Sequence, residues 1–473
     1  MHSLQRSASA LAVLLSLLTV ACTPVADVPD AAGPSDAGPD DAGPDDAGPD
    51  DAGAGDAGVT DAGPLERCSV PFGAGVLRGA DEDDEALGLA VGDDGALWVV
   101  GYEGGMNKSR LLPSGPARAV IARYAPGGAL LDERFIDTAG ADVVEDVIVD
   151  EGGGGAWALG RTTGALPGHV SGGQYDAFVA RLEPGAAAPT RALQFGSARP
   201  EHPRRMAALP AGGLLVAGFS DIYVPSNYVE AWEDPFLAEL TVDAETLEVK
   251  RFEMAGSEGQ DLLNGLVVDP HDGSYYVAGT RLDGTRRGPF LEKRSVSGAL
   301  VWEKQITPFG VDGAAGVVLD ESGNPVVVGS TFLPLGGTVF GEQDVFVVKL
   351  DAATGEILWA TQGGGTKTDW ATDVALGPDG SIWVAGETLG TVVDTAEHAG
   401  SFDVMLLAFD REGQRIGAWQ WGTPGDDHAA AVAVDPCGRA YVAGYASGAL
   451  VPGEAWRGGR DLFVLPVERP EAR

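Results

Sequence analysis

Basic residues are scarce in this sequence. Its 473 residues include 31 Lys and Arg against 70 Asp and Glu, which gives a formal net charge of −39 at pH 7. A chain with this charge repels phosphate backbones and anionic lipid headgroups. We therefore expect neither nucleic acid nor an anionic membrane surface among its partners.

Histidines and motifs for nucleophilic catalysis are also few. The six histidines fall in no metal-ligand spacing such as His-Glu-x-x-His. The closest approach to a G-x-S-x-G motif, residues 255–259, occupies a turn, whereas a nucleophile elbow joins a strand to a helix. These absences predict a protein that is not an enzyme and that has no catalytic residue, metal or cofactor.

One apolar run stands out as a targeting segment, Ala8–Ala21. It follows Arg6 and ends on a small residue before Cys22. It is also shorter than the about 20 residues that a membrane span needs. This layout predicts a secretory signal peptide over residues 1–21.

The residues around the cleavage point, Thr19-Val20-Ala21-Cys22, resemble the lipobox of bacterial lipoproteins. The resemblance implies that Cys22 is lipidated and becomes the new N-terminus. It also implies that Thr23, which is not an aspartate, favours the outer membrane. Acyl chains would anchor the exported chain without a spanning helix, as its sole contact with a membrane. The alternative is an ordinary cleaved signal with an incidental cysteine.

Residues 24–64 are nearly all Asp, Ala, Gly and Pro and include no aromatic residue, Lys or Arg. Such a segment cannot bury enough apolar surface to offset the entropy of ordering it. We expect residues 22–67 to form a disordered, extended spacer, because the carboxylates repel one another and the prolines stiffen the chain. Calcium binding is the alternative, although this chain offers no fixed ligand cage.

One phrase recurs seven times in the rest of the chain: an apolar run, a turn with Gly, a second apolar run and a final Gly. The final glycines lie about 50 to 61 residues apart, at Gly101, Gly160, Gly218, Gly279, Gly329, Gly386 and Gly444. Each phrase predicts a β-hairpin, since pairs such as Asp94-Gly95 supply the positive φ of tight turns. Two more strand-like phrases follow, typified by Asp403–Phe409 and Arg415–Trp421. The repeats predict an all-β fold, a single β-propeller of about seven four-stranded blades.

The repeats resemble those of the SBBP family, the bacterial seven-bladed β-propeller repeat. The best copy is GGGTKTDWATDVALGPDGSIWVAGETLG from Gly363, followed by FDVMLLAFDREGQRIGAWQ from Phe402. The resemblance covers essentially residues 70–468 and implies a propeller domain over residues 68–473. It implies no function, because propellers host unrelated functions on one scaffold.

The last repeat lacks an outer strand, whereas Ser69–Gly73 precedes the first hairpin. We expect this N-terminal segment to supply the missing strand and close the ring. Cys68 and Cys437 lie just before that strand and in the last hairpin turn. Both positions share a face of the propeller if the strands run antiparallel from inside to outside. A disulfide between Cys68 and Cys437 is therefore predicted for an exported protein, with two unpaired cysteines as the alternative.

Leu350–Trp359 resembles the tryptophan-docking motif of quinoprotein dehydrogenase propellers, with a partial copy ending at Trp302. Those enzymes repeat the motif in most blades and often carry adjacent cysteines, which this chain lacks. The structural interpretation is a turn followed by a strand whose Trp packs between blades. It fits a single full copy better.

Acidic residues cluster in the loops that enter the blades, at Asp81–Glu85, Asp142, Glu145, Asp146, Asp369 and Asp426–Asp427. They predict either an acidic mouth for a cation or basic partner, or solvated charges that keep the loops soluble. The third repeat breaks this pattern with Arg199, Arg204 and Arg205. Its long loop carries Tyr223, Tyr228 and Trp232, a candidate ligand or glycan contact. Packing of these aromatic side chains over the blade edge is the alternative.

The sequence thus favours a monomeric, non-catalytic, lipid-anchored module of the cell envelope that binds a protein or polysaccharide or serves as a scaffold. The alternative is a propeller enzyme, either a hydrolase, a lyase or a quinoprotein, with its site in the central funnel. That alternative requires several polar side chains from different blades to point at the ring axis.

Overall fold

The computed structural model describes residues 73, 75–104, 117–150, 154–172, 174–222, 232–244, 246–254, 261–283, 286–307, 312–393 and 398–468. These residues form strands, turns and loops, and they include no helix that is long and apolar enough to cross a membrane. Several predicted features lie outside them, namely the signal segment, Cys22, the spacer, Cys68, Tyr223 and Tyr228.

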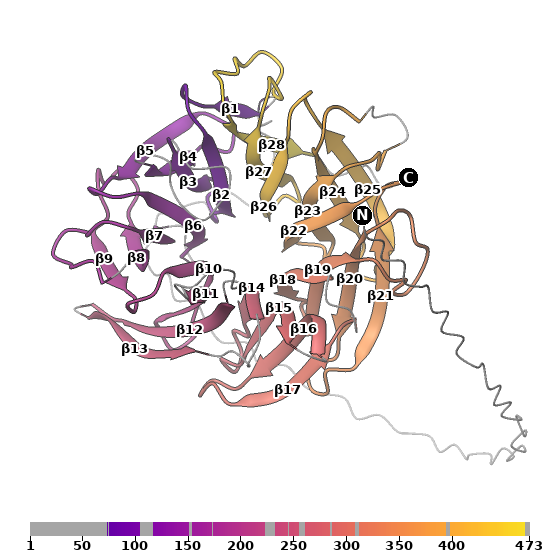
Figure 1. The fold of residues 1–473 in the computed structure, drawn as a ribbon, viewed down its shortest axis with the longest axis horizontal. Helices are drawn as coiled ribbons and strands as arrows, with labels where there is room; N and C mark the ends of the chain where they lie inside the picture. Colours follow the sequence, from indigo (N-terminus) through magenta and orange to yellow (C-terminus); the bar gives the residue numbers. More distant parts are fainter. Residues whose placement is uncertain are drawn as a thin grey trace, which may run out of the picture. The chain divides into compact units, whose positions relative to one another are not determined.

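The strands form seven four-stranded antiparallel sheets, which are arranged as blades around a central axis (Figure 1). The described chain is a seven-bladed β-propeller, as the repeats predict. The first strand of each blade lies at the axis: β2 (Asp84–Val91), β6 (Asp142–Val149), β10 (Glu201–Ala208), β14 (Asp261–Val268), β18 (Gly313–Leu319), β22 (Asp369–Leu376) and β26 (His428–Val434).

The other strands follow outward in chain order. The second strands are β3 (Leu97–Glu103), β7 (Ala156–Thr162), β11 (Leu214–Ile222), β15 (Tyr275–Asp283), β19 (Pro325–Thr331), β23 (Ile382–Thr388) and β27 (Ala440–Ala446). The third strands are β4 (Arg118–Tyr124), β8 (Asp176–Leu182), β12 (Trp232–Val242), β16 (Arg286–Arg294), β20 (Asp344–Leu350), β24 (Asp403–Phe409) and β28 (Asp461–Val467). The outer strands are β5 (Leu130–Ile136), β9 (Arg191–Phe195), β13 (Leu247–Met254), β17 (Leu300–Gln305), β21 (Ile357–Gly363), β25 (Arg415–Trp421) and β1 (Val76–Arg78).

The ring closes through β1, which pairs antiparallel with β28 and completes the seventh blade with a strand from the N-terminal side. The predicted strand exchange is therefore confirmed, but the strand lies later than expected. It spans Val76–Arg78, whereas the sequence suggested Ser69–Gly73. Of the suggested segment only Gly73 is described, and it lies outside any strand.

Cys437 lies in the turn between β26 and β27, and it is disulfide-bonded. Because Cys68 lies outside the described residues, its pairing with Cys437 stays a prediction. Peptide mapping under non-reducing conditions is expected to yield a Cys68–Cys437 cross-linked peptide that is lost on reduction. Recovery of either cysteine in a different cross-link would contradict this pairing.

The hydrophobic core lies between blades rather than in one central mass. Alternate side chains of a strand point to opposite faces of its sheet. In β3, for example, Val99 packs toward the seventh blade, whereas Trp98 and Val100 pack toward the second. Seven such clusters each join two neighbouring blades around the ring.

Each inner strand carries a β-bulge opposite the final glycine of its repeat. At Gly329, for instance, a Cβ would lie 2.0 Å from the carbonyl oxygen of Gly313. The other six final glycines approach a carbonyl oxygen of the inner strand at 1.9–2.3 Å in the same way. The recurring glycine is therefore required by close backbone approach beside the bulge.

The quinoprotein-like segment has a structural use. The Trp302 ring lies against the turn of the next blade, where its Nε1 donates to the Ala352 carbonyl at 3.2 Å. A Cβ at Gly355 of that turn would lie 2.8 Å from the ring, and Trp359 meets Gly413 of the following blade in the same way. The interpretation of these tryptophans as packing between blades is confirmed.

Replacing Trp302 with alanine is expected to lower the free energy of unfolding by about 2 kcal/mol, because the ring is half-buried and its removal uncovers the neighbouring turn. Urea unfolding measures the loss. The matched control is Trp456→Ala, since Trp456 is 44% exposed and should contribute little. Equal effects of the two substitutions would contradict a role for Trp302 between blades.

Candidate functional site

The bulges build a central funnel. The extra residue of each inner strand is turned out of the sheet, and these residues line one cavity of about 460 Å³: Leu87, Glu145, Arg204, Asn264, Ala315, Thr372 and Ala430. Bulges are a known device for redirecting a side chain. Every blade therefore contributes one side chain at the equivalent position around the axis.

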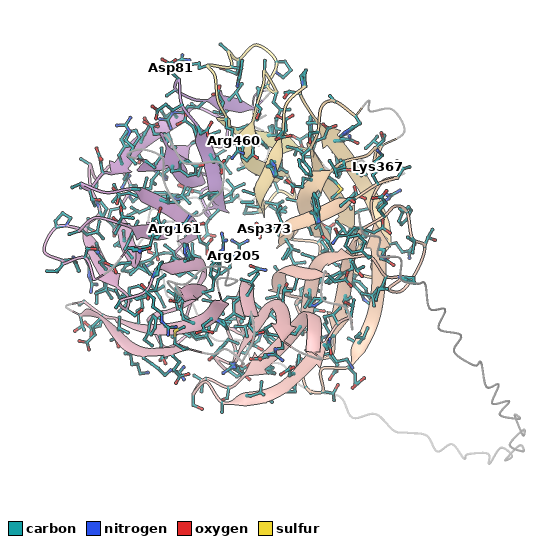
Figure 2. The ribbon with its side chains drawn as sticks, viewed as in Figure 1. Asp81, Arg161, Arg205, Lys367, Asp373 and Arg460 are labelled. Carbon is teal, nitrogen blue, oxygen red and sulfur yellow. The ribbon has the colours of Figure 1, made fainter. Side chains whose placement is uncertain are left out.

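Beneath this layer an ion pair crosses the ring. Nη2 of Arg205, in the third blade, donates to Oδ1 of Asp373, in the sixth blade, at 3.0 Å. Both residues lie near the centre of the ring in Figure 2. Asp373 also accepts from the Val432 backbone N–H at 2.9 Å, and Asp146 accepts from that of Met206 at 2.8 Å. Burial raises the pKa of Asp146 to about 6, while the Arg205 charge acts to lower it.

Asp146, Arg205 and Asp373 each follow the bulged residue of their inner strand. In the other four blades the equivalent residue is small: Gly88, Gly265, Gly316 and Ala431. A Cβ at Gly88 would lie 3.0 Å from the Cα of Asp146, so the inner strands approach closely at this level. Because these four residues are small, the side chains of Arg205, Asp146 and Asp373 have room at the axis, where they form the floor of the funnel.

One wall of the funnel, in the second and third blades, is charged. Nε of Arg161 lies 3.1 Å from Glu145, and Nη1 of Arg204 lies 3.6 Å from the same carboxylate. Arg161 also contacts His202 and lies over the Tyr175 ring, 5.0 Å from its centroid. Two guanidinium groups thus share one carboxylate here.

The opposite wall, in the sixth and seventh blades, is aromatic. Ring centroids are 5.3 Å apart between Trp370 and Phe402, 5.3 Å between Phe402 and His428, and 4.6 Å between His428 and Tyr445. His428 pairs with the Glu387 carboxylate. These rings form a continuous aromatic row that carries a carboxylate–imidazole pair.

The aromatic row continues to the first blade. The Arg460 guanidinium lies 4.2 Å from the Tyr445 ring centroid and pairs with Glu85. Glu85 accepts a hydrogen bond from the Tyr102 hydroxyl, and burial raises the pKa of Tyr102 well above its ordinary value. In the fourth and fifth blades, the described residues that line the cavity are uncharged and include Asn264, Ser330 and Gln343.

Several acids of the entry loops have a structural role that neither of the two predictions included. A carboxylate at or just before the start of a strand accepts a hydrogen bond from the backbone N–H four residues earlier, at 2.6 Å for Asp142 and 2.7 Å for Asp369. The same bond recurs at Asp84, Asp176, Glu201, Asp344, Asp403, Asp427 and Asp461. These carboxylates are buried and fix the loops, while Asp81, Glu82 and Asp426 are exposed.

This burial predicts an acid-stabilised protein. Burial raises the pKa of Asp84 and Asp369 to about 6 and of Glu201 to about 7. Between about pH 4 and pH 7 the native state therefore binds more protons than the unfolded chain, so stability falls as the pH rises through this window. The melting temperature is expected to be several degrees higher at pH 5 than at pH 8.

Scanning calorimetry at the two pH values tests this prediction. Glu201→Gln is the matched variant: it removes one titrating group and should reduce the difference between the two melting temperatures. A melting temperature that is equal or higher at pH 8 would show that these carboxylates do not retain their protons in the native state.

No protein-family model matches the sequence, and neither does any curated protein. Solved structures with a similar fold include Chaetomium thermophilum Sqt1 bound to the N-terminus of ribosomal protein L10. Its TM-score is 0.45, with 13% identity, and the match covers 83% of this chain and 98% of that one. A puromycin-hydrolysing peptidase of Mycobacterium tuberculosis has a TM-score of 0.46 at 13% identity, with 86% of this chain and 54% of that chain covered. The likeness concerns the fold alone.

The structure places the predicted site residues unevenly. Trp232 begins β12, where it pairs with Ile222, while Tyr223 and Tyr228 lie outside the described residues, so their ligand contact stays a prediction. The part of the chain that the structure describes contains no group of three His, Cys, Asp or Glu side chains placed to hold a metal ion. The sequence suggested the central funnel only as the site of the alternative enzyme, and it assigned none of the lining residues to that site. A signal that points to the lining residues is the variation of two adjacent positions in the inner strand of each repeat, for example Glu145-Asp146 and Arg204-Arg205.

Proposed function

We propose that the chain is a non-catalytic binding module of the bacterial cell envelope and that its ligand enters the central funnel. One observation carries the proposal: redirected residues of all seven blades line a single cavity, above the Arg205–Asp373 floor. A cavity of about 460 Å³ with a few fixed polar groups lies in the range that small ligands occupy. A glycan end or short glycan segment suits it better than a folded protein.

The paired charges of the funnel support binding. Glu85 with Arg460, Glu387 with His428, and Glu145 with two arginines are ordered before a ligand arrives. Donors and acceptors that are already in place lose little freedom on binding, which favours affinity. Hydroxyl groups both donate and accept, so such pairs suit a sugar.

Retention of envelope polysaccharide by the full chain tests this function. Polysaccharide from washed cells should be retained by immobilised wild-type protein and lost with Trp370→Ala, which removes a ring from the funnel wall. Trp456→Ala, at an exposed position, is the control and should bind as wild type does. Equal retention by both variants would place the ligand outside the funnel.

The envelope location rests on the N-terminal sequence. A lipid on Cys22, followed by the acidic spacer, would hold an SBBP-type propeller away from the membrane surface. Labelled palmitate should enter the wild-type protein and not Cys22→Ser. Equal labelling of the two proteins would contradict the anchor.

A second candidate is an enzyme that acts on a ligand in the same funnel. The Glu387–His428 pair favours it, because a carboxylate beside an imidazole can orient a general base. Incubating the retained polysaccharide with the protein distinguishes the two functions. Shorter products that are lost with His428→Gln would support the enzyme, and an unchanged chain length would support binding alone.

A further inference from the structure

Five blades carry an aspartate at the same position near the start of the third strand: Asp176, Asp234, Asp344, Asp403 and Asp461. The first and fourth blades carry Arg118 and Gly288 there. The inner strand of the following blade begins close by. The Glu201 N–H, for example, donates to the carbonyl oxygen of Tyr175 at 2.9 Å, immediately before Asp176. At this junction an acid of the second blade therefore lies beside the first acid of the third blade.

Both carboxylates of this junction are buried, with Asp176 2% exposed and Glu201 0% exposed. Oδ2 of Asp176 accepts from the Gly172 N–H at 2.8 Å and from Nε2 of Gln194 at 2.7 Å, and Oε1 of Glu201 accepts from the Ser197 N–H at 2.9 Å. Oδ1 of Asp176 and Oε2 of Glu201 have no hydrogen-bond partner among the residues that the structure describes. Buried polar atoms are almost always hydrogen-bonded, so these two oxygens indicate a partner from outside the chain.

The two oxygens lie side by side over Gly196. A Cβ on that residue would lie 2.4 Å from Oε2 of Glu201 and 3.1 Å from Oδ1 of Asp176. The Ser197 carbonyl oxygen and the same Oδ1 both lie 3.4 Å from the position of a Cβ on Gly172. Oxygens of two carboxylates and one carbonyl thus gather at this junction. Carboxylate and carbonyl oxygens, completed by water, are the ligands of Ca²⁺, which binds them at about 2.3–2.6 Å.

The two junctions without a third-strand aspartate provide a comparison. The acids that follow the first and fourth blades, Asp142 and Asp312, are just as buried, and both oxygens of each are hydrogen-bonded. Asp142 accepts from the N–H and the hydroxyl of Thr138, and Asp312 accepts from two threonine hydroxyls and a backbone N–H. At two junctions that have the aspartate, Asp403 and Asp461 each have one buried oxygen without a hydrogen-bond partner among the described residues. The unpartnered oxygens therefore accompany the pair of acids rather than burial alone.

Charge favours a divalent cation at the pair of Asp176 and Glu201. Two carboxylates that are removed from water are costly unless positive charge accompanies them. Arg199 acts on Glu201, but its side chain is 46% exposed and pairs with Asp234. Burial raises the pKa of Glu201 to about 7, so a proton can neutralise one of the two acids, whereas Ca²⁺ balances both. The acid-stabilised behaviour described above therefore belongs to the calcium-free protein.

We infer that the junction of the second and third blades binds one calcium ion, with Asp176, Glu201 and the Ser197 carbonyl as ligands and water in the remaining positions. The ion would join the loop before the third strand of one blade to the loop that enters the next. Magnesium fits less well, because it demands near-ideal octahedral geometry. The three ligand residues are not among those that line the funnel, so the site is independent of the proposed function.

Calcium binding by the full chain, measured by equilibrium dialysis at pH 8, tests the site. Wild-type protein is expected to bind one calcium ion more than Glu201→Gln. Asp142→Asn is the matched control, because Asp142 is equally buried but has partners on both oxygens, and it should bind as wild type does. Any calcium held by the acidic spacer is common to all three proteins. Calcium should also raise the melting temperature of the wild type by about 2 °C or more over that in EGTA.

Asp176→Asn removes the other carboxylate and should give the same loss of one calcium ion, so the test does not depend on the folding of a single variant. Equal calcium binding by the wild type and these two variants, or a melting temperature that calcium leaves unchanged, would overturn the site. An equal rise in melting temperature with magnesium would overturn the assignment of calcium. These results leave the polysaccharide test unaffected, because Trp370 of the funnel is not a ligand of the site.

Discussion

Replacing Arg205 with methionine is expected to lower the free energy of unfolding by about 3 to 5 kcal/mol. The guanidinium of Arg205 is the cation that faces Asp373, and Asp146 lies close enough for the same charge to act on it. Without it two partly buried carboxylates would face each other across the axis. Their burial is costly unless a positive charge accompanies them.

Urea unfolding of three variants measures this effect. Arg199→Met removes an arginine from an exposed ion pair with Asp234 and should cost less than about 1 kcal/mol. Adding Asp373→Asn to Arg205→Met should recover part of the loss, because one of the two carboxylates is then neutral. If Arg205→Met costs no more than Arg199→Met, the pair across the axis does not stabilise the ring.

Gly329→Ala is the second substitution with a large expected effect. Its Cβ would lie 2.0 Å from the Gly313 carbonyl oxygen and 2.6 Å from the Phe346 ring. The inner strand must then move away from its neighbour, which we expect to cost about 3 kcal/mol or more. The measurement is again the free energy of unfolding in urea.

The same blade offers a matched control. Gly337 is exposed, and a Cβ there would have no atom within 4 Å. Gly337→Ala is therefore expected to change stability by less than about 0.5 kcal/mol. A similar small change at Gly329 would mean that the recurring glycine does not reflect close packing beside the bulge.

Much of the fold could be predicted from the sequence because the repeat is local. Turn glycines such as Gly95 and Gly380 adopt the positive φ that their hairpins require, at 75° and 79°. The sequence suggested Ser69–Gly73 for the closing strand, which is earlier than the observed β1 at Val76–Arg78. This strand has only three residues and takes its register from β28. A strand that short carries little propensity of its own, so its partner decides where it lies.

The site was harder to predict, because its residues meet only when the ring is closed. Arg205 and Asp373 are 168 residues apart and lie in different repeats, and no local pattern joins them. The acids form clusters in the sequence, yet neighbours such as Asp369 and Asp373 have unrelated roles. Asp369 fixes a loop, whereas Asp373 pairs with Arg205 across the axis. Spacing along the chain does not separate these roles.

Side-chain footprinting with hydroxyl radicals, with and without bound envelope polysaccharide, tests the central claim most directly. A ligand in the funnel should protect Trp370 and Leu87 together, because both line the same cavity from different blades and neither is buried in the free protein. Tyr223 and Tyr228, in the loop that the sequence suggested for ligand contact, should be unaffected. Protection confined to that loop, with Trp370 and Leu87 unchanged, would contradict the funnel as the binding site.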